Sequence, residues 1–138
     1  MSHAIFRVAR LHKALAGTLL RGVGLHPGQE LVLMTLWSQG PQRLVDLASA
    51  VESDAPSMTR SITRLERAGL VRRRPSETDR RAVIVEATDA SLDLREKVEG
   101  VWAELERLTV GSLSPARQDA VLADLAVLEE VLEAVPPR

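Results

Sequence analysis

Residues 53–87 read SDAPSMTRSITRLERAGLVRRRPSETDRRAVIVEA, and this stretch decides the fold. It opens with helix signals: Asp54 is a good N-cap, and Pro56 falls in the first turn, where its missing N–H costs little. Gly69 then supplies the left-handed position that ends a helix. Apolar residues recur at i, i+4 and i+7 and should face a core: Met58, Ile62 and Leu65.

The opposite face of this predicted helix carries hydroxyls and guanidiniums, with no acidic residue before Glu66. Such a face offers donors to phosphates and base edges, and its small residues allow close approach in a major groove. It is the face that we expect to contact DNA, together with Pro56 in the first turn. Its candidate contacts are Ser57, Thr59, Arg60, Thr63 and Arg64.

Two strand-like runs follow, at residues 70–74 and 82–87, joined by the turn-rich segment 75–79. The connection is longer than a tight hairpin requires and therefore predicts a projecting wing. An arginine at the tip of a wing can enter a minor groove, where the potential is most negative. The candidate wing residues are Arg74, Arg80 and Arg81, with Asp79 expected to aim Arg81 through a salt bridge.

Residues 44–88 resemble the winged helix-turn-helix of the MarR family of bacterial transcriptional regulators. The family usually has Gly and an apolar residue where Glu52 and Ser53 stand, and often Gly in place of Ser91. The features that match are Leu47-Ala48, Thr59-Arg60, Leu65-Glu66-Arg67, Gly69-Leu70-Val71, Arg73-Arg74, Asp79-Arg80-Arg81 and Thr88.

The resemblance implies a mainly α fold with a small β-wing. A winged helix-turn-helix at residues 25–87 would be flanked by dimerisation helices at 1–24 and 88–138. It further implies a homodimer that binds a pseudo-palindromic site on double-stranded DNA, with repression as the expected sign. A small-molecule effector would bind between the wing domain and the helical region, in a zone that includes Arg10, His12, His26, Trp37 and part of the helix at 88–102.

Apolar periodicity predicts further helices at 3–21, from Pro27 to about Trp37, at 43–51, at 88–110 behind Thr88, and from Ser114-Pro115 onward. The first and the last two are more apolar than packing on a small winged helix requires. A dimer interface built from both termini explains them; an enlarged monomer core is the alternative.

Charge is unevenly distributed along the chain. Residues 60–81 carry eight Arg against three acidic residues (net +5), whereas residues 82–138 carry five basic and twelve acidic groups (net −7). A basic central segment suits a protein that presents one face to nucleic acid. The alternatives are a solvated Arg-rich surface, or an interaction module whose Arg face docks on an acidic protein.

The sequence argues against several other classes of protein. It has no Cys and no long uncharged apolar run, which excludes disulfides and predicts a cytoplasmic protein without a membrane span. It also lacks a Gly-rich phosphate loop and a GxSxG motif, so no enzyme activity and no cofactor are expected. His3, His12 and His26 lack metal-ligand spacing, although a hydrolase with a metal site assembled between elements stays open.

Overall fold

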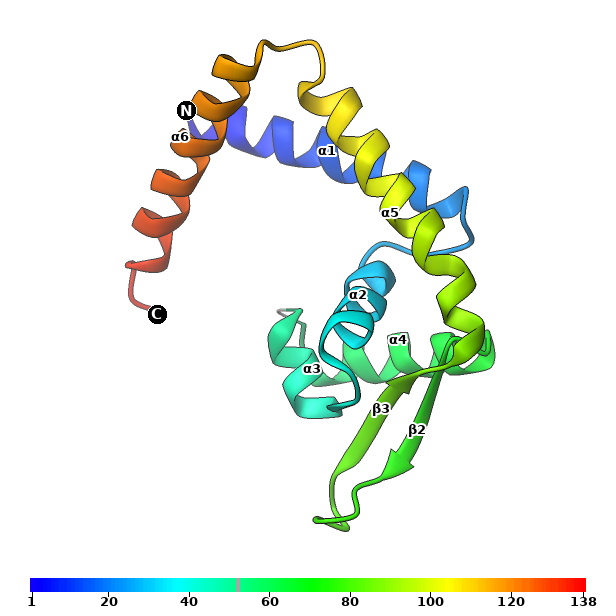
Figure 1. Ribbon diagram of the computed structural model, residues 1–138. Coiled ribbons are helices and arrows are strands. Elements are labelled where there is room, and N and C mark those ends of the chain that lie inside the picture. Colours follow the sequence, from blue (N-terminus) through cyan, green and yellow to red (C-terminus); the bar gives the residue numbers. More distant parts are fainter. Residues whose placement is uncertain (52) are drawn as a thin grey trace. The chain divides into compact units, whose positions relative to one another are not determined.

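The helix predicted from the opening stretch is α4, Ala55–Arg67 (Figure 1). Its N-cap is Asp54, whose Oδ1 accepts the Ser57 N–H at 2.8 Å. Gly69 follows with a φ of 77°, the left-handed conformation that the sequence predicts. The predicted inner face is confirmed, because three side chains are buried at the spacing expected: Met58, Ile62 and Leu65.

The computed structural model describes residues 1–51 and 53–138. It confirms the fold class expected from the sequence, mainly α with a small β-wing. Two compact units divide the chain, Met1–Trp102 and Ala103–Arg138. No described helix is both long and apolar enough to cross a bilayer. The remaining elements are α1 (Ser2–Arg21), α2 (Gln29–Gln39), β1 (Gln42–Arg43), α3 (Leu44–Ala50), β2 (Val71–Pro75), β3 (Val83–Ala87), α5 (Asp89–Val110) and α6 (Pro115–Glu133).

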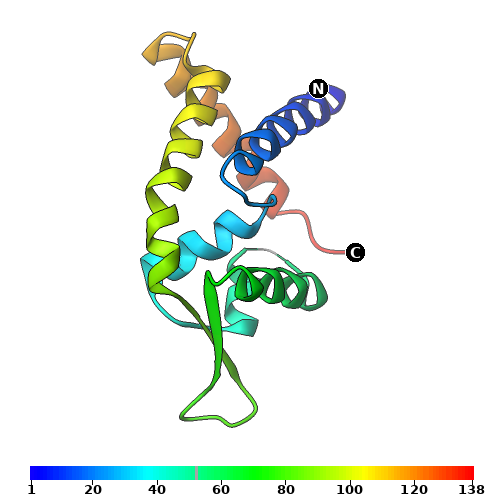
Figure 2. The same cartoon turned by 90° about the vertical axis from the view of Figure 1, so that its right-hand side faces the viewer.

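The sheet is antiparallel, with the strand order β1-β3-β2. In the β2–β3 hairpin, Val71 pairs with Ala87 and Pro75 with Val83, and Val71 and Val85 are buried against the helices. The hairpin extends beyond α3 and α4, as the wing prediction requires (Figures 1 and 2). Strand β1 was not predicted, since two residues are too short to show an alternating pattern.

The start of α2 corrects the sequence prediction. The helix begins at Gln29 and not at Pro27, because Gly28 takes a φ of 95° and residues 26–28 form a turn. The Gln29 side chain stabilises this turn by accepting the His26 N–H at 2.9 Å. The predicted departure at Glu52, in the turn of the helix-turn-helix, lies outside the described residues.

A hydrogen bond joins α2 to the start of α5. Trp37, which is half-buried against the core, donates its Nε1–H to the Ser91 hydroxyl at 3.0 Å. Ser91 is fully buried and donates in turn to the Thr88 carbonyl at 2.7 Å. Ser91, at a position where the MarR family often has Gly, is therefore a buried polar residue whose hydroxyl both accepts and donates a hydrogen bond.

The terminal helices leave most of their apolar side chains exposed. Along α1 only Gly17 and Leu20 are buried, while Phe6 is 75% exposed. Helix α6 begins as predicted, with Ser114 accepting the Arg117 N–H at 3.3 Å, but it buries no residue. The exposed large apolar residues of α6 are Leu122, Leu125, Val127, Leu128, Val131 and Leu132.

One buried carboxyl provides a test of the fold. Glu30 lies at the start of α2 with Oε2 2.8 Å from the Gly28 nitrogen, whose N–H it accepts. Burial raises the pKa of Glu30 above its ordinary value, and hydrogen bonds from the backbone N–H groups of Glu30 and Gly28 offset this only in part. Stability from the neutral carboxyl is therefore present below the unfolded-state pKa and is lost as the pH rises through the folded-state pKa.

We expect Glu30→Gln to increase the free energy of unfolding near neutral pH, by less than about 1 kcal/mol. Glutamine keeps an acceptor for Gly28 and has no charge to desolvate. Thermal unfolding of both proteins should show a difference that shrinks as the pH falls through the raised folded-state pKa of Glu30 and is gone below the ordinary glutamate pKa of about 4.3. A difference independent of pH would contradict this account.

Candidate nucleic-acid interface

The exposed face of α4 holds a short chain of polar contacts. Ser57 donates its hydroxyl to Asp54 Oδ2 at 2.9 Å, and Arg60 Nη2 donates to the Ser57 hydroxyl at 3.1 Å. The Ser57 N–H, followed by its hydroxyl, lowers the pKa of Asp54. The capping carboxylate thus stays ionised and, through Ser57, orients the Arg60 guanidinium.

The other predicted contacts of α4 also lie on this face. Thr59 and Thr63 donate their hydroxyls to the carbonyls of Ala55 and Thr59, both at 2.9 Å, which leaves the hydroxyl oxygens able to accept. Arg64 is exposed, as is Pro56 in the first turn. In the described part of the chain, no carboxylate lies within ion-pair distance of Arg64.

Carboxylates bind the arginines of β2. Glu86 on β3 lies 2.7 Å from Arg72 and 3.4 Å from Arg74, and these bonds, with that of Arg72 the larger, lower the pKa of Glu86. Glu66, at the end of α4, lies 2.9 Å from the Arg73 guanidinium and also accepts the Arg73 N–H. The candidate wing residue Arg74 therefore shares a carboxylate in the free protein.

The tip of the wing differs from the prediction at Asp79. Its Oδ1 accepts the backbone N–H of Arg81 at 3.0 Å, and its Oδ2 lies 4.0 Å from Nη2 of Arg43. The predicted salt bridge between Asp79 and the Arg81 guanidinium is wrong, because the carboxylate closes an Asx turn on the Arg81 backbone and faces Arg43. Asp79 thus holds the backbone of Arg81 and leaves its side chain exposed.

Pairing divides the basic segment into two groups of side chains. The three arginines of β2 lie against Glu66 and Glu86. Among the described residues, the rest of the segment's arginines make no ion pair, and we call them the unpaired arginines: Arg60, Arg64, Arg67, Arg80 and Arg81. They lie on α4 and at the wing tip, so the excess positive charge is concentrated on these two elements.

Sequence reasoning missed Arg43. Its backbone pairs with Ile84 of β3, and this pairing brings its side chain to the wing. The only local signal was an arginine at the position directly before α3, where a capping side chain is usual. Nothing in the neighbouring sequence indicates Asp79 as its partner.

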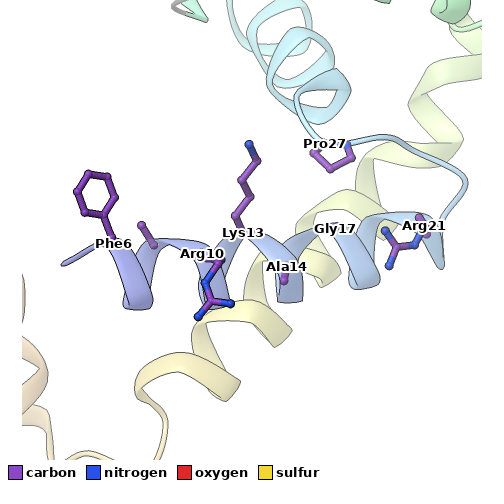
Figure 3. A pocket seen from close by; sticks show the side chains of 8 residues that line it. Phe6, Arg10, Lys13, Ala14, Gly17, Arg21 and Pro27 are labelled. Carbon is purple, nitrogen blue, oxygen red and sulfur yellow. The ribbon is translucent and has the colours of Figure 1, made fainter. Parts of the chain in front are cut away.

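A groove of about 510 Å³ runs along α1, and Pro27 lies beside Gly17 in its lining (Figure 3). Arg10 of the predicted effector zone lines the groove, whereas Trp37 packs against the core instead. The charged side chains of its lining are all basic: Arg10, Lys13 and Arg21. The described residues contain no group of three His, Cys, Asp or Glu able to hold a metal ion.

Comparison with known proteins places this fold. The family model of the MarR family matches residues 25–83. The HTH-type transcriptional regulator YfiV of Bacillus subtilis is 35% identical over 106 residues, which span 76% of this chain and 66% of YfiV, just under two thirds of that relative.

Solved structures agree along nearly the whole chain. AbsC, a MarR family transcriptional regulator from Streptomyces coelicolor, is 26% identical with a TM-score of 0.82, covering 96% of this chain and 92% of AbsC. Bordetella bronchiseptica BpsR, whose DNA binding is regulated by 6-hydroxynicotinic acid, is 27% identical with a TM-score of 0.83, covering 94% and 92%. Residues 25–83 therefore form a winged helix-turn-helix of the MarR family, and the chain has the fold of that family's transcriptional regulators.

Proposed function

We propose that the chain binds double-stranded DNA as a homodimer, through α4 and the wing of each protomer, and represses transcription from the bound site. The observation that carries the proposal is the concentration of unpaired arginines on α4 and at the wing tip. In this proposal the protein is cytoplasmic and has no catalytic activity, and it represses transcription by blocking RNA polymerase at the bound site. The contacts assigned to DNA are Pro56, Ser57, Thr59, Arg60, Thr63, Arg64, Arg74, Arg80 and Arg81, with Asp79 holding the wing turn.

We assign DNA binding and dimerisation to different parts of the chain, according to which helices expose apolar side chains. Residues 25–87 form the DNA-binding domain, and residues 1–24 and 88–138 pair two protomers. The exposed apolar side chains of α1 and α6 support this, because each Leu or Val that a partner fully buries contributes about 1.5–3 kcal/mol. In such a dimer the two copies of α4 are the recognition helices, and they lie in successive major grooves. They therefore require a pseudo-palindromic site with half-sites about 10 bp apart, or a multiple of this.

An effector would release the DNA by changing the distance between the two recognition helices. The groove along α1 favours an anionic ligand, because Arg10, Lys13 and Arg21 line it together with apolar side chains. BpsR, whose regulator 6-hydroxynicotinic acid is a carboxylic acid, supports this class of ligand.

Salt dependence tests the proposal directly. The probe is a duplex taken from the region upstream of the protein's own gene. We expect its affinity to fall steeply with salt, with a slope of log K against log[salt] of about −5 or steeper, because phosphates that the protein binds release their counterions. Fluorescence anisotropy between about 50 and 200 mM salt measures this slope. A shallow slope, together with a stable complex with an acidic protein, would instead favour the interaction-module alternative.

A further inference from the structure

A small notch of about 190 Å³ lies between the start of α3 and the wing. Its charged side chains are two guanidiniums and one carboxylate, those of Arg43, Arg81 and Asp79. The net charge of the notch is therefore +1. Apolar side chains form the rest of its lining: Leu44, Val45, Ala82 and Val83.

The notch is held together by backbone contacts from both sides. Arg43 is fixed at the edge of the sheet, where β1 pairs it with Ile84 of β3. On the wing side, Ala82 donates its N–H to the Asp79 carbonyl at 3.0 Å, and the Arg81 N–H occupies Asp79 Oδ1 at the same distance. Backbone hydrogen bonds therefore fix the chain segments that bear the guanidiniums of Arg43 and Arg81.

The Arg43 side chain is available to a new partner. Its contact with Asp79 is long, at 4.0 Å, and both side chains are 52% exposed. An exposed ion pair of this kind contributes about 0–1 kcal/mol, so an incoming anion displaces it at little cost. Asp79 stays with the wing when this happens, because the Arg81 N–H holds its other oxygen.

We propose that the notch binds a backbone phosphate of the DNA and that Arg43 is a phosphate-contact residue. A guanidinium donates two parallel hydrogen bonds to phosphate oxygens, so Arg43 and Arg81 together satisfy one phosphate more fully than either alone. The location fits, because the first helix of a helix-turn-helix crosses the DNA backbone and Arg43 stands directly before α3. The inference rests on the DNA-binding function proposed above.

The test compares Arg43→Ala with the wild-type protein on a specific and on an unrelated duplex. A phosphate contact carries no sequence information, so affinity should fall about 3- to 10-fold on both duplexes. The slope of log K against log[salt] should become shallower by about 1 for each protomer. Arg43→Lys, which retains the charge, should keep the wild-type slope.

A matched control is Arg72→Ala, which removes one arginine of β2 that lies 2.7 Å from Glu86, outside the notch. It should lose less than about threefold in affinity and keep the wild-type slope, and circular dichroism checks that each variant is folded. If Arg43→Ala kept the wild-type slope, the proposed phosphate site in the notch would be wrong, even if the variant lost affinity for the specific duplex alone. The proposed DNA-binding function would still stand. If the wild-type protein bound no duplex, both proposals would fail.

Discussion

Replacing Leu125 and Leu132 by aspartate in one double variant is expected to convert the proposed homodimer to a monomer and to weaken DNA binding by about 10²- to 10⁴-fold. Within the single chain these side chains are 57% and 65% exposed, so the substitutions disturb little packing in the protomer. In a dimer they would place two carboxylates per protomer against an apolar partner, where an unpaired charge is strongly unfavourable. The loss of affinity follows because a monomer holds one half-site and loses the gain from linked binding.

Sedimentation measures the oligomeric state, and anisotropy on the full site measures the affinity. Glu130→Lys is the control on the same helix, since it changes the charge at an exposed polar position of α6. It should remain dimeric. Leu11→Asp repeats the test at an exposed leucine of another helix, α1, in case the α6 variant loses helix content. Dimers in both leucine variants, with unchanged affinity, would contradict the proposed interface.

The sequence specifies those parts of the fold that depend on local signals. Helix α4 was predicted with its cap, its buried face and its Gly stop because Asp54, Ile62 and Gly69 each act within a few residues of chain. The Ser114-Pro115 start of α6 is a signal of the same kind. The candidate contacts on α4 share one face for the same reason, since helical spacing alone decides it.

Contacts between distant segments account for what the sequence did not predict. Strand β1 exists because Gln42 and Arg43 pair with β3, and no pattern within two residues indicates this. The eight arginines of residues 60–81 look equivalent in the sequence. Only the fold brings Glu86 beside Arg72 and leaves Arg81 without a carboxylate in the described part of the chain.

That division of the arginines yields a sharper prediction than the net charge does. Arg81→Ala is expected to weaken DNA binding roughly 10- to 100-fold for each protomer, because each protomer loses a charge-assisted contact worth about 1.5–3 kcal/mol. Arg72→Ala is the matched control: it removes the same charge from the same wing, but from a side chain already 2.7 Å from Glu86. We expect the control to lose less than about threefold, since its guanidinium is largely neutralised before DNA arrives.

The comparison of these two variants separates a shaped surface from a diffuse positive field. If long-range attraction alone held the DNA, Arg72 and Arg81 would contribute alike and both variants would lose affinity equally. If Arg81 contacts the DNA directly, Arg81→Ala should lose far more affinity than Arg72→Ala, while sedimentation and thermal unfolding remain those of the wild-type protein. The wing tip has no part in the core, so a drop in stability for Arg81→Ala would show instead that the residue serves the fold.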